Sequence, residues 1–372
     1  MAELRISKVD KIYRSRKGDV HAVKALGLTV NPGEIVALLG SSGCGKTSTL
    51  RMIAGFEEVT NGSIMLGGRP IHTLAPAARG VAMAFEAYSL YPPLTIGENM
   101  SFALKSSKLS QAEQESRVRN MAQMLEIADI LNKYPSSVSG GQQQRASLGR
   151  ALVRDAGLYL LDEPMGQLEP QLRAVLRGRI KHYLRERKCT TILVTHDQTE
   201  ANALADRIAV MEGGVLQQFA TPAELKAAPA NLFTGTFIGE PPMNVFTAEA
   251  AAAGGHVSFR VEGGTTLSYP SAEISPSLRE RLARMPQVSI GIRPHALHLG
   301  DGPLRGKVMA CQWLGDQTHV AVDVGGRTVV SASQERVALL PGSDVSLRVA
   351  AHDLHLFEPE SGMAIAHGGT PA

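Results

Sequence analysis

The sequence predicts an α/β fold with a parallel sheet, followed by a smaller β-rich domain. Three observations favour this fold class. Residues 34–54 have the order strand, glycine-rich loop, helix. Two later runs, residues 158–161 and 191–195, have the near-continuous hydrophobicity of parallel strands covered on both faces. Beyond residue 245, short β-type runs alternate with glycine-rich turns, as in a small barrel or sandwich.

Length and composition limit the number of domains and the class of protein. A chain of 372 residues is long enough for two domains, and 44% hydrophobic with 20% charged residues is ordinary for a globular protein. The net charge of +3 neither favours nor excludes nucleic acid, and there is no long basic run. The three cysteines are widely spaced and form no CxxC pair, so we expect reduced thiols in a cytosolic protein rather than zinc.

No segment of the sequence predicts membrane insertion. The first nine residues mix charged and apolar side chains, unlike a signal peptide. Nothing approaches the roughly 18 consecutive apolar residues that a membrane span requires. We therefore expect that another chain would have to hold this protein at a membrane.

The first domain is expected to span residues 1–238. Strands should fill residues 3–39, and a hairpin should follow at 63–71 around two glycines. Residues 95–155 are expected to form a helical subdomain, because a capping box at 110–113 precedes apolar residues with helical spacing. These are Val118, Met121, Leu125 and Ala128. A further helix over residues 172–187 is basic and amphipathic, which we interpret as a solvated face rather than a nucleic-acid surface.

The second domain is expected to span residues 239–364. A linker rich in glycine and proline marks its start at 239–242. Its β-type runs fall at residues 256–261, 288–292, 318–324, 328–331 and 345–349. Residues 365–372 are predicted to be a disordered tail.

The glycine-rich loop fits the template Gly, four residues, Gly, Lys, then Ser or Thr. The expected ATP-binding residues here are Gly40, Ser41, Ser42, Gly43, Cys44, Gly45, Lys46, Thr47 and Ser48. Backbone N–H groups of such a loop turn toward a polyphosphate, and the helix that follows adds partial positive charge. Lys46 is expected to reach the β- and γ-phosphates, and the Thr47 hydroxyl to bind Mg²⁺. A chance glycine-rich turn is the alternative, and the flanking strand and helix favour the nucleotide site.

Cys44 lies inside this loop. A helix N-terminus lowers the pKa of a thiol, so sensitivity to alkylation is one interpretation, and ordinary packing is the other.

Three residues follow the apolar strands. Asp162 ends one strand, the usual place for a ligand contact in an open α/β sheet, and is expected to bind Mg²⁺. Glu163 beside it is positioned to accept a proton from an attacking water molecule. His196 ends the next strand and is expected to hydrogen-bond the γ-phosphate. A helix cap for the carboxylates and a structural histidine are the alternatives.

A second anion-binding pattern starts another helix. Its residues are Ser139, Gly140, Gly141 and Gln142. One ATP does not need two such sites from one chain, so the economical solution is a dimer in which this site completes the partner's nucleotide. A plain N-cap at Ser139 is the alternative.

These motifs, taken in order, resemble those of ABC ATPases. The signature motif resembles residues 138–142, the strand that ends in the catalytic acidic pair resembles 158–164, and the switch segment resembles 195–197. Residues 9–13 resemble the segment whose aromatic ring stacks on adenine, which assigns that role to Tyr13.

The C-terminal part narrows the resemblance to carbohydrate-importer ATPases of the maltose and glycerol-phosphate type. Residues 237–244, 291–294 and 354–357 resemble their C-terminal β domain, an OB-like, TOBE-type domain. The resemblance covers the chain to about residue 364. It implies the energy-coupling subunit of an importer for sugars, polyols or glycerol phosphate, with ATP and Mg²⁺ as cofactors.

The resemblance also implies partners. Two ATPase subunits close head to tail on ATP, and two transmembrane permease subunits and an extracytoplasmic solute-binding protein complete the importer. The groove beside residues 85–91 is implied to receive a permease helix. Tyr88 and Tyr91 are the expected contacts, and aromatic core packing is the alternative for both. The expected location is therefore peripheral, on the cytoplasmic face of the cell membrane, without nucleic acid.

Three positions depart from the family pattern. Glu86 replaces a Gln that would bind Mg²⁺ and offer an N–H donor; it can still bind the metal, but sets a carboxylate near the γ-phosphate. Glu169 replaces an Asp that contacts the opposite site, and Val138 is a mild change. We therefore expect a second, non-identical ATPase subunit. One alternative is a homodimer, and another is a soluble ABC ATPase of DNA repair or translation. A third is that the C-terminal domain serves mainly as a regulatory docking module. The soluble class requires long heptad repeats or a second cassette, and the sequence has neither.

Overall fold

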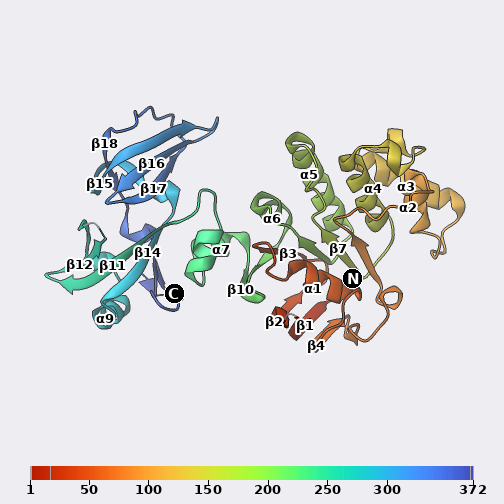
Figure 1. Ribbon diagram of the computed structural model, residues 1–372, viewed down its shortest axis with the longest axis horizontal. Coiled ribbons are helices and arrows are strands. Elements are labelled where there is room, and N and C mark those ends of the chain that lie inside the picture. Colours follow the sequence, from red (N-terminus) through yellow and green to blue (C-terminus); the bar gives the residue numbers. More distant parts are fainter. Residues whose placement is uncertain (1, 17, 263, 369, 372) are drawn as a thin grey trace. The chain divides into compact units, whose positions relative to one another are not determined.

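The computed structural model describes residues 2–16, 18–262, 264–368 and 370–371. The chain divides into two compact units, Met1–Pro222 and Ala223–Ala372 (Figure 1). This division falls before the expected boundary at residue 238. As a result, α8 (Leu232–Phe237) and all of α7 (Pro222–Ala227) except its first residue belong to the second unit.

A four-stranded antiparallel sheet opens the first unit. Its order is β2-β1-β4-β5. The strands are β1 (Leu4–Tyr13), β2 (Val20–Val30), β4 (Asn61–Leu66) and β5 (Arg69–Pro70). The predicted hairpin is confirmed, because Met65 pairs with Pro70 and Leu66 with Arg69 across Gly67 and Gly68.

A six-stranded sheet of order β10-β9-β3-β8-β7-β6 forms the centre of the same unit. The strands are β3 (Ile35–Gly40), β6 (Val81–Ala84), β7 (Leu158–Asp162), β8 (Thr191–Val194), β9 (Arg207–Glu212) and β10 (Val215–Ala220). All neighbours pair in parallel except β9 with β10. Every residue of β3, β7 and β8 is buried, as the hydrophobic runs predict. Because these three strands are adjacent and parallel, the segments after them meet at one edge of the sheet.

Helices of the first unit fall into two groups. In the first, α1 (Lys46–Ala54) and α6 (Gln198–Leu204) pack against the central sheet, and α5 (Pro170–Glu186) packs on α6. The second is the helical subdomain, with α2 (Ile96–Phe102), α3 (Gln111–Met124) and α4 (Gly140–Leu152). These three helices pack on one another, away from β1, β2 and β4 (Figure 1). Each begins with a reciprocal capping box, at Thr95, Ser110 and Ser139.

Two antiparallel sheets share one hydrophobic core in the second unit. The larger contains β11 (Asn244–Ala253), β12 (His256–Val261), β13 (Thr266–Pro270), β14 (Gln287–Ile292), β19 (Leu354–Phe357), β20 (Ala364–His367) and β21 (Thr370–Pro371). The smaller contains β15 (His298–Trp313), β16 (Thr318–Val324), β17 (Arg327–Ser333) and β18 (Asp344–Arg348). The β-rich second domain is thus confirmed.

This unit differs from the prediction in two places. It contains a helix, α9 (Pro276–Arg284), which packs on β11 through Leu278 and Leu282. Where residues 365–372 were expected as a disordered tail, β20 pairs with β19, and β21 pairs with β20. The tail prediction at Gly369 and Ala372 lies outside the described residues. Buried apolar residues such as Ile365 and Ala366 explain why this edge is ordered.

Candidate functional site

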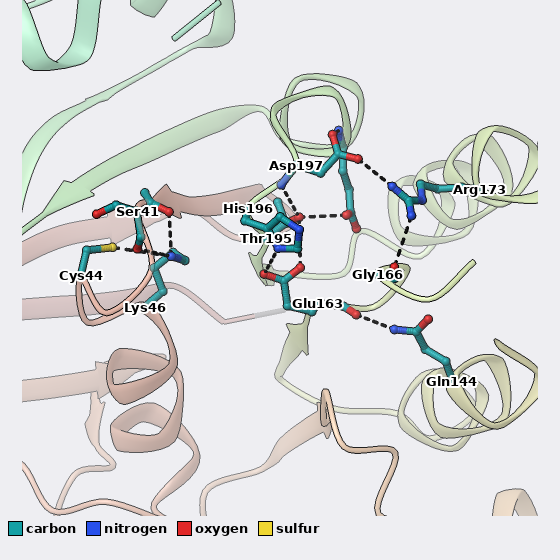
Figure 2. A network of polar contacts seen from close by, with 12 residues as sticks. Ser41, Cys44, Lys46, Gln144, Glu163, Gly166, Arg173, Thr195, His196 and Asp197 are labelled. Atoms are coloured by element: carbon teal, nitrogen blue, oxygen red, sulfur yellow. Dashed lines mark hydrogen bonds and ion pairs between the residues drawn. The ribbon is translucent and has the colours of Figure 1, made fainter. Parts of the chain in front are cut away.

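The phosphate loop joins β3 to α1, and its carbonyl oxygens face the ammonium group of Lys46. The Lys46 ammonium donates hydrogen bonds to the carbonyl oxygens of Gly40 and Ser41, both at 2.8 Å, and lies 3.6 Å from Cys44 Sγ (Figure 2). Gly45 has φ 98°, and a Cβ there would collide with the carbonyl oxygen of Ala22. The template glycines are therefore required, and the loop surrounds a buried cation.

Cys44 is buried within this loop. Its burial raises the pKa of the thiol and outweighs the opposing effect of Lys46. The thiolate is the reactive form, so this environment favours the packing interpretation of Cys44 over reactivity.

Tyr13 reaches the loop from the end of β1. Its hydroxyl lies 3.1 Å from Ser48 Oγ, in α1. The Lys11 ammonium is 4.7 Å from the centre of the Tyr13 ring and is also paired with Glu57 at 2.9 Å. The Tyr13 ring is therefore fixed from two sides next to the phosphate loop, in the position expected of a base-stacking residue.

Asp162, the last residue of β7, has the chemistry of a cation ligand. Its side chain is buried, and among the described residues its Oδ1 atom has no hydrogen-bond partner. Burial raises its pKa to about 6, and the charges of Glu86 and Glu163 add to this, while Arg51 and Lys46 oppose it. A buried carboxylate oxygen without a protein partner, beside further carboxylates, fits a divalent cation.

The oxygen donors at hand suit Mg²⁺ in particular. Within the described chain, no three His, Cys, Asp or Glu side chains gather closely enough to hold a metal alone. Mg²⁺ is commonly held by one or two carboxylates, a hydroxyl and substrate phosphates. The predicted ligands Asp162, Thr47 and Glu86 supply the protein part of such a set.

Glu163 follows Asp162 and is held at four points. Its backbone has φ 45°, a left-handed conformation that is costly for a non-glycine residue. Its N–H donates to Val194 O at 2.9 Å, and its carbonyl accepts from Gln144 Nε2 at 2.7 Å. Its carboxylate lies 2.9 Å from His196 Nδ1 (Figure 2) and 3.5 Å from Thr195 Oγ1. The structure thus brings the predicted base and the predicted switch histidine into direct contact.

His196 is the exposed member of this pair. Its side chain is 73% exposed, against 15% for Glu163. With Nδ1 facing Glu163, the imidazole has Nε2 left for a further hydrogen bond.

The signature segment begins α4. Ser139 Oγ accepts a hydrogen bond from Gln142 N at 3.3 Å, and Gln142 Oε1 accepts one from Ser139 N at 3.0 Å. A Cβ on Gly140 would lie 2.9 Å from Gln167 Oε1, and one on Gly141 would lie 3.3 Å from Gln167 O. The two glycines therefore allow the 165–169 segment to pack closely on α4.

The signature residues and the phosphate loop are not joined. Among the described residues, no hydrogen bond links Ser139, Gly140, Gly141 or Gln142 to the loop or to Asp162. The other predicted site residues, Lys46, Asp162, Glu163 and His196, gather where β3, β7 and β8 end. Within one chain, the signature segment and the phosphate loop thus remain separate, and their joint role in nucleotide binding stays a prediction.

The loop after β6 carries Glu86 and the predicted docking tyrosines. Tyr91 lines a groove of about 480 Å³ together with Phe56, Phe85, Phe102 and Arg150. Tyr88 is not among the groove residues. Its hydroxyl is buried and lies near Gly140, so of the two tyrosines only Tyr91 faces this groove.

Sequence reasoning missed several residues around Glu163. Gln144 bonds both Glu163 O and Gln167 N, and Arg173 bonds Asp197 as well as the carbonyls of Gly166 and Leu168. Glu200 was also missed. The one available signal is a polar residue at a buried position of an amphipathic helix, which is where Gln144 and Glu200 both fall.

Comparisons with known proteins identify the family. Residues 23–166 match the family model described as ABC transporter, and residues 290–357 match the TOBE domain. An uncharacterized ABC transporter ATP-binding protein, y4oS, of Sinorhizobium fredii is 39% identical, covering 98% of this chain and 95% of that protein. The sn-glycerol-3-phosphate import ATP-binding protein UgpC of Cereibacter sphaeroides is 38% identical over 97% of this chain and 99% of its own length.

Two further similarities point the same way. The maltose/maltodextrin import ATP-binding protein MalK of Vibrio cholerae is 37% identical, over 97% of this chain and 95% of that protein. Among solved structures, the ATP-binding cassette MJ0796, a dimer in a post-hydrolysis state bound to ADP and Pi, has a TM-score of 0.55 and 26% identity. It matches 59% of this chain and 98% of its own.

Proposed function

The chain belongs to the ABC transporter family as an ATP-binding import subunit, and from this premise we propose how its residues couple ATP hydrolysis to solute import. The proposed function depends above all on one observation. The Lys46 loop, Asp162, Glu163 and His196 lie together at one edge of the central sheet. The names of the relatives support a sugar or glycerol phosphate as the solute, and a polyol remains part of the predicted range.

ATP binds between Tyr13 and the phosphate loop. The adenine ring stacks on Tyr13, whose hydroxyl is already tied to Ser48, and the phosphates lie against the backbone of residues 40–48. Lys46 exchanges its contacts with the loop carbonyls for phosphate oxygens. Thr47, Asp162 and Glu86 would hold Mg²⁺, which would neutralise negative charge on the phosphates when bound.

Glu163 acts as the base. Its carboxylate accepts a proton from the water molecule that attacks the γ-phosphate, and ADP and phosphate are released. His196 orients this carboxylate through Nδ1, and its exposed Nε2 side hydrogen-bonds the γ-phosphate, so that loss of the phosphate is transmitted to the segment after β8.

Two subunits close head to tail on ATP. The Ser139 hydroxyl accepts a hydrogen bond within its own chain, so its hydrogen remains to be donated to the partner's γ-phosphate. The separation of this segment from its own phosphate loop, and the dimeric state of the MJ0796 cassette, support this arrangement. Hydrolysis removes the shared phosphate and the dimer reopens.

The groove at Tyr91 is the docking site for a helix of a transmembrane permease. Its lining combines four aromatic side chains with small apolar residues, which is typical of a surface that anchors a partner helix. None of the described helices is long and apolar enough to cross a membrane. In the proposed assembly, two permease subunits span the membrane, a solute-binding protein lies on the far side, and this chain is a peripheral subunit on the cytoplasmic face.

We further propose that the second ATPase subunit differs from this one. Glu86 stands at the metal site and Glu169 at the N-cap of α5, both in loops that link the two nucleotide sites. A homodimer is the alternative. Purifying the transporter expressed from its own operon distinguishes the two arrangements. If the complex contains two copies of this chain and no second ATPase, the proposal is wrong.

The function itself is tested with Glu163→Gln, which retains shape and removes the base. We expect this variant to bind MgATP, to lose hydrolysis by at least about 100-fold, and to form a stable dimer with its natural partner in size-exclusion chromatography. Glu115→Gln, an exposed change in α3, is the matched control. A monomeric Glu163→Gln chain, saturated with MgATP and its partner, contradicts the closure mechanism.

A further inference from the structure

A buried carboxyl group lies behind the catalytic pair. Glu200, in α6, is 1% exposed. Its Oε2 atom is 2.9 Å from Thr195 Oγ1, and its Oε1 atom has no hydrogen-bond partner among the described residues. Burying an ionised carboxylate with an unpaired oxygen is costly, so this environment favours the neutral acid.

The charged groups around Glu200 do not compensate a negative charge on its carboxylate. Glu163 approaches from the end of β7 and Asp197 from the N-cap of α6, and both carry the same sign of charge. Arg173 of α5 is the opposing cation, but its guanidinium is paired with Asp197 at 3.0 Å. The strand β3, which also packs on α6, contributes only apolar residues and a glycine. Burial is the largest cause that raises the pKa of Glu200, to about 7.

The Thr195 hydroxyl connects this group to the base. Thr195 is fully buried, and its Oγ1 lies 2.9 Å from Glu200 Oε2 and 3.5 Å from Glu163 Oε2. The same oxygen accepts a hydrogen bond from Asp197 N at 3.1 Å. A hydroxyl has one hydrogen, so it can donate to only one of the two carboxyl groups at a time.

The protonation of Glu200 therefore has a consequence for the base. A neutral Glu200 donates its own hydrogen to Thr195 Oγ1, and the Thr195 hydrogen then points to Glu163. An ionised Glu200 takes the Thr195 hydrogen bond for itself and leaves that oxygen of Glu163 without it. The change takes up or releases one proton from solvent and breaks no other covalent bond.

We propose that Glu200 is a positioning residue for ATP hydrolysis, whose protonation state decides whether the Thr195 hydroxyl donates to Glu200 or to Glu163. The inference rests on the proposed role of Glu163 as the base. A carboxylate that receives a charge-assisted hydrogen bond is a weaker base, so the site is slower when Glu200 is neutral. Turnover at saturating ATP should then rise as Glu200 ionises.

The test is the ratio of kcat at pH 8 to kcat at pH 6 in the full-length chain. Glu200→Gln keeps the shape and has one protonation state at both pH values. We expect its ratio to fall at least about threefold below that of the unmodified chain, with KM for ATP unchanged. Dividing the kcat ratio of the variant by that of the unmodified chain cancels the effect of other titrating groups, because both proteins share those groups.

Two variants of Thr195 separate positioning from a structural effect. Thr195→Val removes the hydroxyl and keeps the volume, and it should lower the ratio as Glu200→Gln does. Thr195→Ser keeps the hydroxyl and should retain the ratio of the unmodified chain. The double variant Thr195→Val with Glu200→Gln should match Thr195→Val alone, because both act through the same hydrogen bond.

The outcomes that overturn the inference are distinct from those that overturn the function. If Glu200→Gln or Thr195→Val lowers stability but keeps the kcat ratio, or if Thr195→Ser loses it, Glu200 has only a structural role. If the two changes are additive, they do not share the hydroxyl. If Glu163→Gln hydrolyses ATP at the normal rate, the assignment of the base itself is wrong, whatever the Glu200 variants show.

Discussion

The Nδ1 atom of His196 lies 2.9 Å from Oε1 of Glu163, although the two residues follow different strands. The contact is possible because β7 and β8 are parallel neighbours, with Asp162 paired to Val194. The residues after both strands therefore leave the sheet at the same edge. This geometry couples the proposed base, Glu163, to the histidine that we propose faces the phosphate.

His196→Ala should lower kcat for ATP by about 10- to 100-fold, because Glu163 loses the group that orients its carboxylate. Affinity for ATP should fall less than kcat, because the proposed hydrogen bond to the γ-phosphate is lost while the phosphate loop is intact. Steady-state ATPase assays with nucleotide-binding measurements check both points. His182→Ala provides the control, because His182 is an exposed histidine on α5. Equal activity of the two variants would exclude an orienting role for His196.

Glu86→Gln should weaken divalent-metal binding in the absence of nucleotide. Glu86 is the largest charge contribution that raises the pKa of Asp162, so it lies close enough to attract a cation at the same place. We expect Mn²⁺, followed by electron paramagnetic resonance, to bind about three- to tenfold more weakly at pH 8. The lower pKa of Asp162 in this variant should also let binding persist to lower pH. Glu115→Gln is the control, and an identical Mn²⁺ titration in Glu86→Gln would remove Glu86 from the metal site.

Glu200→Gln should make the first unit more stable than the unmodified unit at high pH. The folded pKa of Glu200 is raised to about 7 from an ordinary value of 4.5, so the folded state binds more protons between these values. The stability of the unmodified unit therefore falls as pH rises from 4.5 to 7. The advantage of the Gln variant should grow by on the order of 2 kcal/mol between pH 5 and pH 8.

Urea unfolding at several pH values measures this difference. The transition of the first unit is identified as the one that shifts when ATP is added. Glu115→Gln, at an exposed position, should show no such growth with pH. A constant difference between the Glu200→Gln and unmodified proteins would mean that Glu200 is not neutral in the folded state.

Tyr91→Ala should reduce docking to the permease without changing the ATPase activity of the isolated chain. The Tyr91 ring is 45% exposed, packs on Phe102 at 4.9 Å between ring centres, and lies 5.4 Å from the Arg150 guanidinium. An aromatic anchor of this kind is worth about 2 kcal/mol, or roughly 30-fold in affinity. Co-purification with the permeases and a transport assay measure the loss. Val175→Ala, an exposed apolar change on α5, should have no effect, and unchanged co-purification of Tyr91→Ala would place the docking site elsewhere.

The second unit shows how a buried charge can be structural. Arg293 is buried and donates hydrogen bonds to the carbonyl oxygens of Lys226, Gly235 and Ile238. These contacts tie α7 and α8 to the end of β14. They give a physical reason why the unit begins at Ala223, earlier than the glycine- and proline-rich linker indicated.

The sequence by itself determined the local chemistry of the nucleotide site. The spacing of Gly40, Gly45 and Lys46 predicts a loop that the structure forms around the lysine, and the apolar runs before Asp162 and His196 predict buried strands. Such features depend on neighbours in the chain, through backbone conformation and the alternation of buried positions, so a single sequence is sufficient to find them.

Tertiary structure alone decided which of these segments meet. The strand order β9-β3-β8-β7-β6 does not follow the chain, and no local pattern encodes it. The bond from Gln144 to Glu163 and the path from Glu200 through Thr195 to Glu163 also arise only when α4 and α6 pack beside the sheet. Burial, unlike backbone propensity, is a property of the whole fold, and burial is the physical basis of the influence that we propose for Glu200 on Glu163.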